Sequence, residues 1–537
     1  MLSKILRYFY TLIHLRPTQF YYRGFYFLRN RLIGNAFQVR VLDSRLVPAA
    51  AKTHFLTVPK YYIKKAKEVH FVFLNSVHSF ESDDKIDWNY ASKGKLWCYN
   101  LNYFDYLNQV EMTYDDGMTL IHSYINNTHS LKDGLEPYPI SLRNINWIKF
   151  CMRHQFRDSN VDGFIFSGYQ HLLKNLEYHL LGNHLLENGY SLFFGALYFR
   201  DKNLYKKAIQ ILQSELNEQI LLDGAHFELS PMYHQILLER LLDCINLAKN
   251  SDDFVDQSFF YFMESKAISM LSWLSEITFK NGDIPLLNDS SLGIASSSST
   301  IFNYARSLDI VWTPSCVLSE SGYRKRVSDK WEFVLDIGKI GPDYIPGHAH
   351  ADTFSFVMHY SGKPFLVDPG ISTYEKNERR NFERGTSFHN TVCVNGKNQS
   401  DVWGGFRVGK RAKVSIVEDS KDKISAFHGG YSSFGVTHQR SWRFDSDESI
   451  LIEDVINKKG KRKLLNEAFF YFAPDIVPEW ESSSIISFAG LDCKMHFSGS
   501  VFDFRIEDYE CPQGYNKFVT AKRLVVTFSN SLITLIR

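Results

Sequence analysis

"IPGHAHADTFSFVMHYSGKPFLVDPG", residues 345–370, contains the clearest strand pattern of the chain. Two apolar runs on either side of a Ser-Gly dipeptide are typical of a β-hairpin. Ahead of them, His348, His350 and Asp352 stand at every second position, with an alanine in each gap. Because residues two apart share a face of an extended strand, we expect a strand that starts near His348 and presents a polar, metal-binding row opposite two methyl groups.

This hairpin lies in the second of two blocks into which the chain divides. From about residue 115 to 310, apolar residues recur at three- and four-residue spacing between short Gly, Asp and Asn breaks, which predicts successive helical hairpins. After about residue 320 the segments are short, β-rich and separated by turn dipeptides. Separate blocks predict an α+β multidomain chain, in which an α domain precedes an antiparallel β domain. We expect a lead-in over residues 1–95, the helical domain over 96–315 and the β domain over 316–537.

The composition is that of an ordinary globular protein, with 44% hydrophobic and 22% charged residues among 537. The formal net charge of +2 predicts neither a nucleic-acid-binding surface nor an acidic tail. Seven cysteines are scattered without CxxC spacing, which argues against a disulfide framework and against a cysteine-built zinc site. The aromatic content of 15% suits sugar stacking as well as an ordinary core.

The N-terminal segment is basic and aromatic. Its first 32 residues contain six lysines and arginines, and no acid precedes Asp43. The apolar run is too short to span a bilayer, and no small-residue cleavage site follows, so a secretory signal is poorly supported and we expect a cytoplasmic or envelope-associated protein. Two interpretations are open: a peripheral helix that lies on a membrane surface, or an amphipathic helix packed on the body of the protein.

Two helical stretches carry polar groups suited to chemistry. In "GNHLLENG", Asn183 and Glu187 share a helix face and His184 neighbours Glu187. In "DGAHFELSPMYHQ", a polar loop leads into a helix that begins near Tyr233, and functional side chains are common at such junctions. Each stretch taken alone is equally compatible with a buried, hydrogen-bonded polar cluster.

A third set of candidates extends the opening stretch. Asp368 follows in "FLVDPG" and His389 in "SFHNTV". The Ser-Gly hairpin would bring the strand of Asp368 beside the strand of His350, and two imidazoles with one carboxylate fit a zinc site. Scattered polar residues are the alternative. His348, on the same face as His350, would be left free beside the metal.

The motifs "GNHLLENG", "DGAHFELSPMYHQ", "GHAHAD", "FLVDPG" and "SFHNTV", in this order, resemble the heparinase II/III family of polysaccharide lyases, which includes related oligo-alginate lyases. The resemblance covers roughly residues 100–420 and implies an incomplete (α/α) toroid followed by an antiparallel β-sandwich. It also implies a mainly structural zinc ion, Zn²⁺, held by His350, Asp368 and His389. Such chains look similar to those that accompany bacterial capsule or exopolysaccharide assembly.

The resemblance implies roles for five further residues. Asn183 and His184 would contact the carboxylate of an acidic polysaccharide substrate. Tyr233 would be the proton-transferring tyrosine and His348 a second catalytic histidine. Glu187 would support the site.

The reaction implied is β-elimination at a uronic acid, which leaves an unsaturated uronate. A base removes the C5 proton and the C4–O4 bond breaks, so donors that neutralise the carboxylate stabilise the enolate. Asn183, His184 and His348 are suitable donors. A tyrosine has a pKa of about 10, so Tyr233 as a base requires nearby positive charge to lower it.

Three other functions are compatible with the sequence. A glycoside hydrolase, a class that (α/α) toroids also host, would need two carboxylates flanking the bond, and Glu187 and Glu228 are the candidates. A non-catalytic carbohydrate-binding or exopolysaccharide-assembly protein would not need the Tyr233 hydroxyl. A zinc hydrolase would need an open metal position that faces the cleft.

Overall fold

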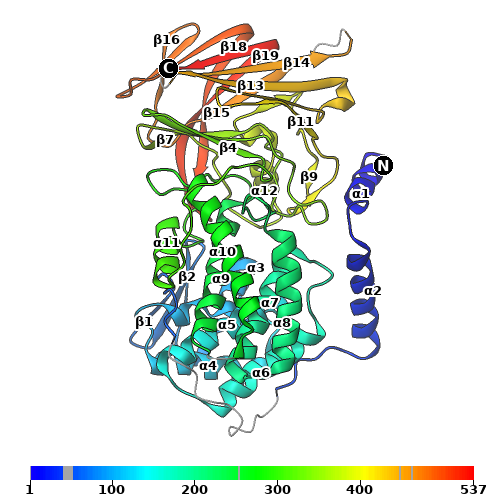
Figure 1. The fold of residues 1–537 in the computed structure, drawn as a ribbon, viewed down its shortest axis with the longest axis vertical. Coiled ribbons are helices and arrows are strands. Elements are labelled where there is room, and N and C mark those ends of the chain that lie inside the picture. The colour runs from blue at the N-terminus through cyan, green and yellow to red at the C-terminus, as the bar shows by residue number, and fades with distance from the viewer. Residues whose placement is uncertain (1, 40–52, 252–253, 447–448, 461–463) are drawn as a thin grey trace.

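The computed structural model describes residues 2–39, 53–251, 254–446, 449–460 and 464–537. A helical region forms one end of the molecule and a β region the other, while the first two helices run along one side (Figure 1). The α+β fold class expected from the sequence is confirmed: a helix-rich region is followed by an antiparallel β region. Among the described residues, no helix is long and apolar enough to cross a membrane.

The N-terminal half is helical apart from one small sheet. The side helices are α1 (Leu2–Leu12) and α2 (Pro17–Leu32). A three-stranded antiparallel sheet follows in a stretch whose sequence pattern was mixed: β1 (Tyr62–Lys65), β2 (Glu68–Phe73) and β3 (Ser76–Phe80). The helical region then contains α3 (Lys95–Tyr103), α4 (Tyr114–Asn126), α5 (Pro137–His154), α6 (Ser159–Lys174), α7 (Gly182–Phe199), α8 (Lys202–Gln219), α9 (Pro231–Lys249), α10 (Gln257–Ile277) and α11 (Ser298–Ser307).

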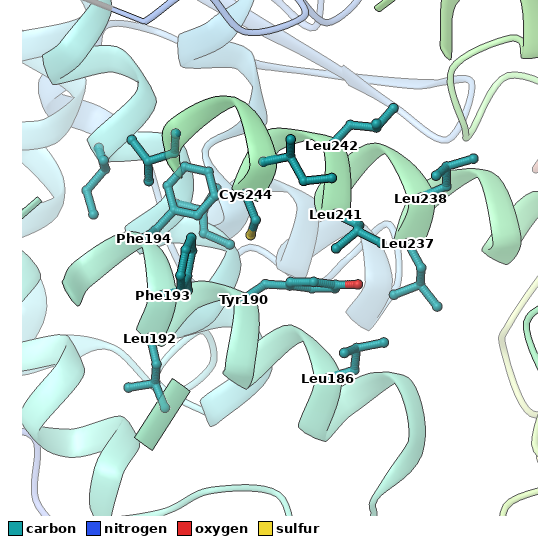
Figure 2. Close-up of a cluster of buried hydrophobic side chains, with 14 of the residues drawn as sticks. Leu186, Tyr190, Leu192, Phe193, Phe194, Leu237, Leu238, Leu241, Leu242 and Cys244 are labelled. Atoms are coloured by element: carbon teal, nitrogen blue, oxygen red, sulfur yellow. The ribbon is translucent and has the colours of Figure 1, made fainter. Parts of the chain in front are cut away.

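These helices form hairpins that share one apolar core. Helices α5, α7 and α9 pack side by side, and α6, α8 and α10 each pack against one of them. Figure 2 shows Tyr190 of α7 pointing toward Leu237 and Leu241 of α9, with Phe193 of α7 nearer Cys244 of α9. All five side chains are almost fully buried, and so is nearly every residue of α7, which explains why this helix lacks a polar solvent-facing side.

The C-terminal half is a two-sheet sandwich in which all strand pairs are antiparallel. The smaller sheet has the order β4 (Tyr323–Val327), β5 (Trp331–Asp336), β6 (Phe356–Tyr360) and β7 (Lys363–Leu366). The short helix α12 (Glu378–Glu383) and the ribbon of β9 (Val402–Trp403) and β10 (Arg407–Val408) lie outside both sheets. The larger sheet contains β8 (Val392–Val394), β11 (Val414–Asp419), β12 (Lys423–His428), β13 (Val436–Ser446), β14 (Ser449–Lys458), β15 (Asn466–Tyr471), β16 (Pro478–Ser482), β17 (Ile485–Phe488), β18 (Lys494–Pro512) and β19 (Phe518–Ile536).

The hairpin expected around the Ser-Gly dipeptide is present. Strands β6 and β7 pair, and Ser361 (φ 49°) and Gly362 (φ 74°) both adopt the left-handed conformation that a tight two-residue hairpin turn requires. Phe356 of β6 stacks on Phe333 of β5, with ring centroids 5.0 Å apart, in the core between the two sheets. Periodicity and turn chemistry were therefore sufficient to place this hairpin.

The prediction that the strand begins near His348 is wrong, because the first strand residue is Phe356. The preceding backbone bonds to other loops instead of to a strand, since the amide of His350 donates to Asn288 Oδ1 at 3.0 Å. The expected alternation nevertheless holds. Ala349 and Ala351 are buried in an apolar cluster with Ile340, Val402 and Val408, while the histidines bond elsewhere.

Candidate active site

The candidate residues come from both halves of the chain and lie at helix starts and in loops. Asn183 and His184 occupy the first turn of α7, and Tyr233 the first turn of α9. Ser230 caps α9 by accepting from the amide of Tyr233 at 3.2 Å, with a proline at the first helical position. His348 lies in the loop ahead of β6. The first turns of α7 and α9 thus fix the backbone positions of three of the four candidate residues, Asn183, His184 and Tyr233.

Backbone strain is concentrated around these positions. Four non-glycine residues have a positive φ in segments that carry the candidates: Leu181 (67°), Leu229 (58°), Asn288 (55°) and Phe354 (71°). Such conformations cost roughly 1–3 kcal/mol each and persist only where surrounding contacts impose them. Their clustering supports a functional site here rather than a simple packing contact between domains.

Asp289 joins the two histidines of the opening stretch. Its Oδ2 lies 2.8 Å from Nδ1 of His348, and its Oδ1 lies 2.8 Å from Nε2 of His350. Arg380 Nη2 donates to Oδ2 at 2.6 Å as part of a bidentate pair. Burial opposes ionisation of Asp289, but Arg380 and both histidines outweigh it and hold its pKa well below the ordinary value. Because an ionised carboxylate only accepts hydrogen bonds, both histidine nitrogens that face it carry protons.

The other nitrogen of His348 faces the helical region. Nε2 lies 3.4 Å from Nδ2 of Asn183 and 3.7 Å from Oε2 of Glu228. The imidazole also packs on the ring of Tyr233, with centroids 4.0 Å apart. Since Nδ1 is committed to Asp289, Nε2 is the position at which His348 can take up or release a proton.

Tyr233 is linked to His348 through a second tyrosine. The hydroxyl of Tyr374 donates to the hydroxyl of Tyr233 at 3.0 Å and lies 3.4 Å from Nδ1 of His348. Burial raises the pKa of Tyr233 above its usual range, and the hydrogen bond from Tyr374 and the charge of Arg380 offset this only in part. Arg380 acts in the direction expected of nearby positive charge, but burial has the larger effect on this pKa. A neutral phenol is instead suited to donate a proton.

His184 lies beside this group without touching it directly. Its Nδ1 is 3.0 Å from Oε1 of Glu177, and its ring packs against Tyr138 at 4.7 Å. Tyr138 in turn is close enough to Tyr233 for the two hydroxyls to affect each other's ionisation. Burial opposes the charged form of His184, but the attraction and hydrogen bond of Glu177 outweigh it and raise its pKa. The raised pKa favours the imidazolium form of His184, whose side chain is partly exposed.

Two buried glutamates lie behind these side chains. Glu228 accepts from Nδ2 of Asn183 at 3.2 Å and is 1% exposed. Glu187 is fully buried, and Nε of Arg240 lies 3.5 Å from its Oε2. Burial raises the pKa of both carboxyl groups. The predicted supporting role of Glu187 would act through this packing rather than through direct contact with His348.

The predicted zinc ligands His350, Asp368 and His389 lie near one another, and His389 contacts Asp368 directly. Nδ1 of His389 lies 2.7 Å from Oδ2 of Asp368, and the rings of His350 and His389 are 5.2 Å apart. As the side chains stand, the described part of the chain contains no group of three or more His, Cys, Asp or Glu side chains that could hold a metal ion. However, Nδ1 of His350, Nε2 of His389 and Oδ2 of Asp352 are all buried without a hydrogen-bond partner. Two imidazoles and a carboxylate in this state match the donor set that zinc prefers.

A groove of about 710 Å³ opens beside the segment that precedes α7. It is bounded by α2 on one side and by the helical region on the other, and Arg23, Arg29 and Lys132 contribute cations to its lining. His179 lies in the lining, and the charge of His184 affects the pKa of His179. The groove borders the segment that precedes α7, and its lining holds more cationic than anionic side chains.

The sequence reveals part of this arrangement only. Asp289, Tyr374 and Arg380 were not identified, although they fix His348 and Tyr233. The one available signal was composition: polar residues in the loops "LLNDSS" and "STYEKNERR" follow apolar segments. A loop of this kind is typical of many surface turns, so the signal was not specific.

Two family models match this chain in tandem. The model described as heparinase II/III N-terminus matches residues 140–311, and the model described as heparinase II/III-like, C-terminal matches residues 313–536. A heparin-sulfate lyase of Pedobacter heparinus is 27% identical over 304 residues, which are 51% of this chain and 44% of the lyase. A heparin-sulfate lyase of Bacteroides stercoris is 25% identical over 281 residues, 46% of this chain and 41% of the lyase. The matched segment thus spans less than half the length of these curated relatives.

Solved structures show the same architecture. A crystal structure of heparinase III superposes with a TM-score of 0.67 at 15% identity, over 84% of this chain and 79% of that one. A heparan sulfate lyase mutant from Pedobacter heparinus superposes with a TM-score of 0.57 at 18% identity, over 86% and 79% of the two chains. At these identities the likeness establishes the fold alone, and it agrees with the helical region followed by an antiparallel β region described above.

Proposed function

The chain belongs to the heparinase II/III-like family, and we propose that it is a polysaccharide lyase that cleaves a uronate-containing acidic polysaccharide by β-elimination. The observation that carries this proposal is the contact of His348 with Tyr233 on one side and Asn183 on the other, with Asp289 fixing the imidazole tautomer. These contacts bring a proton acceptor, a proton donor and an amide close to one another, as an elimination requires.

Each step of the proposed reaction is assigned to a group of this chain. Nε2 of His348 takes the C5 proton, because Nδ1 already carries one for Asp289. The amide of Asn183 and the imidazolium of His184 neutralise the uronate carboxylate and so stabilise the enolate. Tyr233 donates its phenolic proton to the leaving O4, a role that the raised pKa supports. The released product carries the C4–C5 double bond.

A zinc ion held by His350, Asp368 and His389 would have a structural role. Asp352, whose Oδ2 lacks a partner, is an additional candidate ligand. The ion would supply a fixed positive charge that ties the loop ahead of β6 to the loop ahead of β8. Asp289, held by Arg380, also orients both histidines of the loop. The position of His348 therefore depends on the carboxylate of Asp289 as well as on any metal.

The cationic groove supports an acidic chain as substrate. Arg23, Arg29 and Lys132 face the same space, and Glu136 is the acidic residue in the lining. Both curated relatives are named for lyase action on heparin sulfate, a sulfated acidic glycan. A glycosaminoglycan and a bacterial exopolysaccharide that contains uronate share the chemistry that this groove would recognise, namely repeated negative charges on a sugar chain.

The alternative functions fit the geometry less well. A hydrolase pair made of Glu187 and Glu228 would have to flank the scissile bond, but both carboxyl groups are buried behind Asn183. A binding protein has no need for a histidine whose tautomer is fixed by a buried Asp–Arg pair. A zinc hydrolase needs a metal position open to solvent, whereas His350 and His389 are both fully buried.

The decisive experiment is a screen of acidic polysaccharides. Heparan sulfate, alginate and other uronate-containing polymers are incubated with the protein, and both ultraviolet absorbance and new reducing ends are measured. With a lyase, the absorbance of the unsaturated uronate increases in proportion to the number of new reducing ends. New ends without absorbance would identify a hydrolase, and binding without new ends would identify a carbohydrate-binding protein.

A further inference from the structure

The side helices α1 and α2 expose apolar side chains where soluble helices expose polar ones. Ile5, Phe9 and Leu12 follow the i, i+4, i+7 spacing of one helix face, and Tyr21, Leu28 and Leu32 stand at i, i+7 and i+11, which also share one face. These six residues are called the outer face here. Each is exposed, from 47% for Leu12 to 79% for Leu32. Monomeric proteins rarely leave such a continuous apolar surface in water without an interaction partner.

The opposite faces of the same helices carry the polar contacts. On α1, Arg7 pairs with Asp401 at 2.7 Å, next to the β9–β10 ribbon. On α2, Gln19 donates to the carbonyl of Leu180 at 3.1 Å, ahead of α7. The two helices are therefore attached to both regions of the protein with their polar sides inward (Figure 1). The apolar side faces out, and no described part of the chain covers it.

Charge restricts what can cover the outer face. The first 42 residues contain no Asp or Glu, whereas lysines and arginines recur along both helices. Arg7 and Arg16 are paired with Asp401 and Glu218, but Arg31 is exposed three residues after Leu28 and so on the same helix face. A second copy of this acid-free surface would be repelled. An anionic surface with an apolar interior would be attracted by the positive charge and would also bury the apolar side chains.

We propose that the outer face of α1 and α2 docks the protein on an anionic lipid membrane, with both helices lying flat at the interface. Neither helix is long enough to cross a bilayer, so the attachment is peripheral. Aromatic residues such as Phe9 and Tyr21 suit the boundary between headgroups and acyl chains. The cationic groove borders the inward side of α2 through Tyr26, so docking leaves it open to a polysaccharide.

The test measures binding of the full chain to vesicles by co-sedimentation. Vesicles of mixed phosphatidylglycerol and phosphatidylcholine should bind the protein, with affinity that falls as salt rises, and vesicles of phosphatidylcholine alone should bind at least tenfold more weakly. Arg31→Gln should weaken binding to the anionic vesicles about fivefold. Phe9→Glu combined with Leu28→Glu should weaken it more than tenfold, since both acids would enter the interface.

The matched control is Trp480→Glu combined with Phe502→Glu, which changes two exposed aromatic residues of the β region and should leave vesicle binding unchanged. Light scattering and thermal unfolding establish that all variants fold as monomers. The proposal is overturned if the wild-type chain ignores anionic vesicles or if the Phe9/Leu28 variant binds as well as wild type. It is also overturned if wild type forms a concentration-dependent dimer that this variant abolishes, because the outer face would then be a contact between copies.

Discussion

Asp289 and His348 are 59 residues apart in sequence, yet Oδ2 of the carboxylate lies 2.8 Å from Nδ1 of the imidazole. The same carboxylate holds His350 and is itself held by Arg380. In the sequence, His348 and His350 are related only by their alternation. In the structure, Asp289 of the preceding domain holds both imidazoles in place. This relationship gives the first prediction.

Asp289→Asn should reduce kcat by about 10–100-fold while changing KM little. The amide keeps the size of the side chain but removes the charge that fixes the proton on Nδ1 of His348. Steady-state rates measured by product absorbance provide the check. Asp283→Asn, an exposed acid in the same connection, is the control. Equal rates for Asp289→Asn and wild type would show that the tautomer is fixed by something else.

Tyr233→Phe should fold normally, bind substrate and lose nearly all turnover. The change deletes the proposed proton donor to O4 while keeping the ring that packs on His348 at 4.0 Å. Tyr374→Phe removes the hydrogen bond to Tyr233 and the longer contact with His348, and should cost roughly tenfold, as expected for loss of about 1.4 kcal/mol. Near-normal elimination by Tyr233→Phe would remove the tyrosine from the mechanism.

Glu177→Gln should move the alkaline side of the pH–rate profile to lower pH. Glu177 raises the pKa of His184, so the imidazolium persists below that raised pKa and is lost as pH rises through it. Without the acid, His184 loses its charge at a lower pH and neutralises the substrate carboxylate less well. The profile of kcat/KM is compared with that of Glu111→Gln, an exposed acid far from the site. Superimposable profiles for all three proteins would exclude His184 as the charged donor.

Purified protein should contain about one zinc per chain by elemental analysis. Chelation should lower the melting temperature, because orphaned nitrogens of His350 and His389 would be left buried without a partner. His389→Ala should lose the metal, whereas His496→Ala on the surface should retain it. A metal content below about one tenth of an equivalent, with no effect of chelator on unfolding, would show that this protein does not bind zinc.

Asp454→Asn should destabilise the β region by about 3–5 kcal/mol. Burial opposes its ionisation, but Arg440 and His438 lower its pKa to about 2. A depressed acid contributes stability above its unfolded pKa of about 3.9, and this is lost as pH falls toward 2. Arg440 also donates to the carbonyl groups of Phe354 and Asn390, so the change would leave a buried arginine uncompensated. Denaturant melts are compared with the exposed control Asp508→Asn, which should match wild type.

The sequence alone was sufficient for the order of helices and strands and for the hairpin at Ser361–Gly362, because these depend on periodicity and on turn chemistry within a few residues. It also indicated which face of the opening stretch is apolar, since Ala349 and Ala351 are buried as alternation requires. It misplaced the start of the strand at His348. Alternation is a property of any extended backbone, and whether such a segment pairs as a strand depends on a partner elsewhere in the chain.

The tertiary structure decided how the chemical groups meet. Asp289 and Tyr374 come from loops without periodicity, and their contacts with Tyr233 and His348 join positions 26 to 141 residues apart. Arg380 comes from the short helix α12 and acts through Asp289. Electrostatics also depends on burial, which raises the pKa of Tyr233 by more than the charge of Arg380 lowers it. Helices α1 and α2 are a further example. Their basic and aromatic composition is visible in the sequence. Contacts with residues hundreds of positions away decide that the polar face points inward and the apolar face outward.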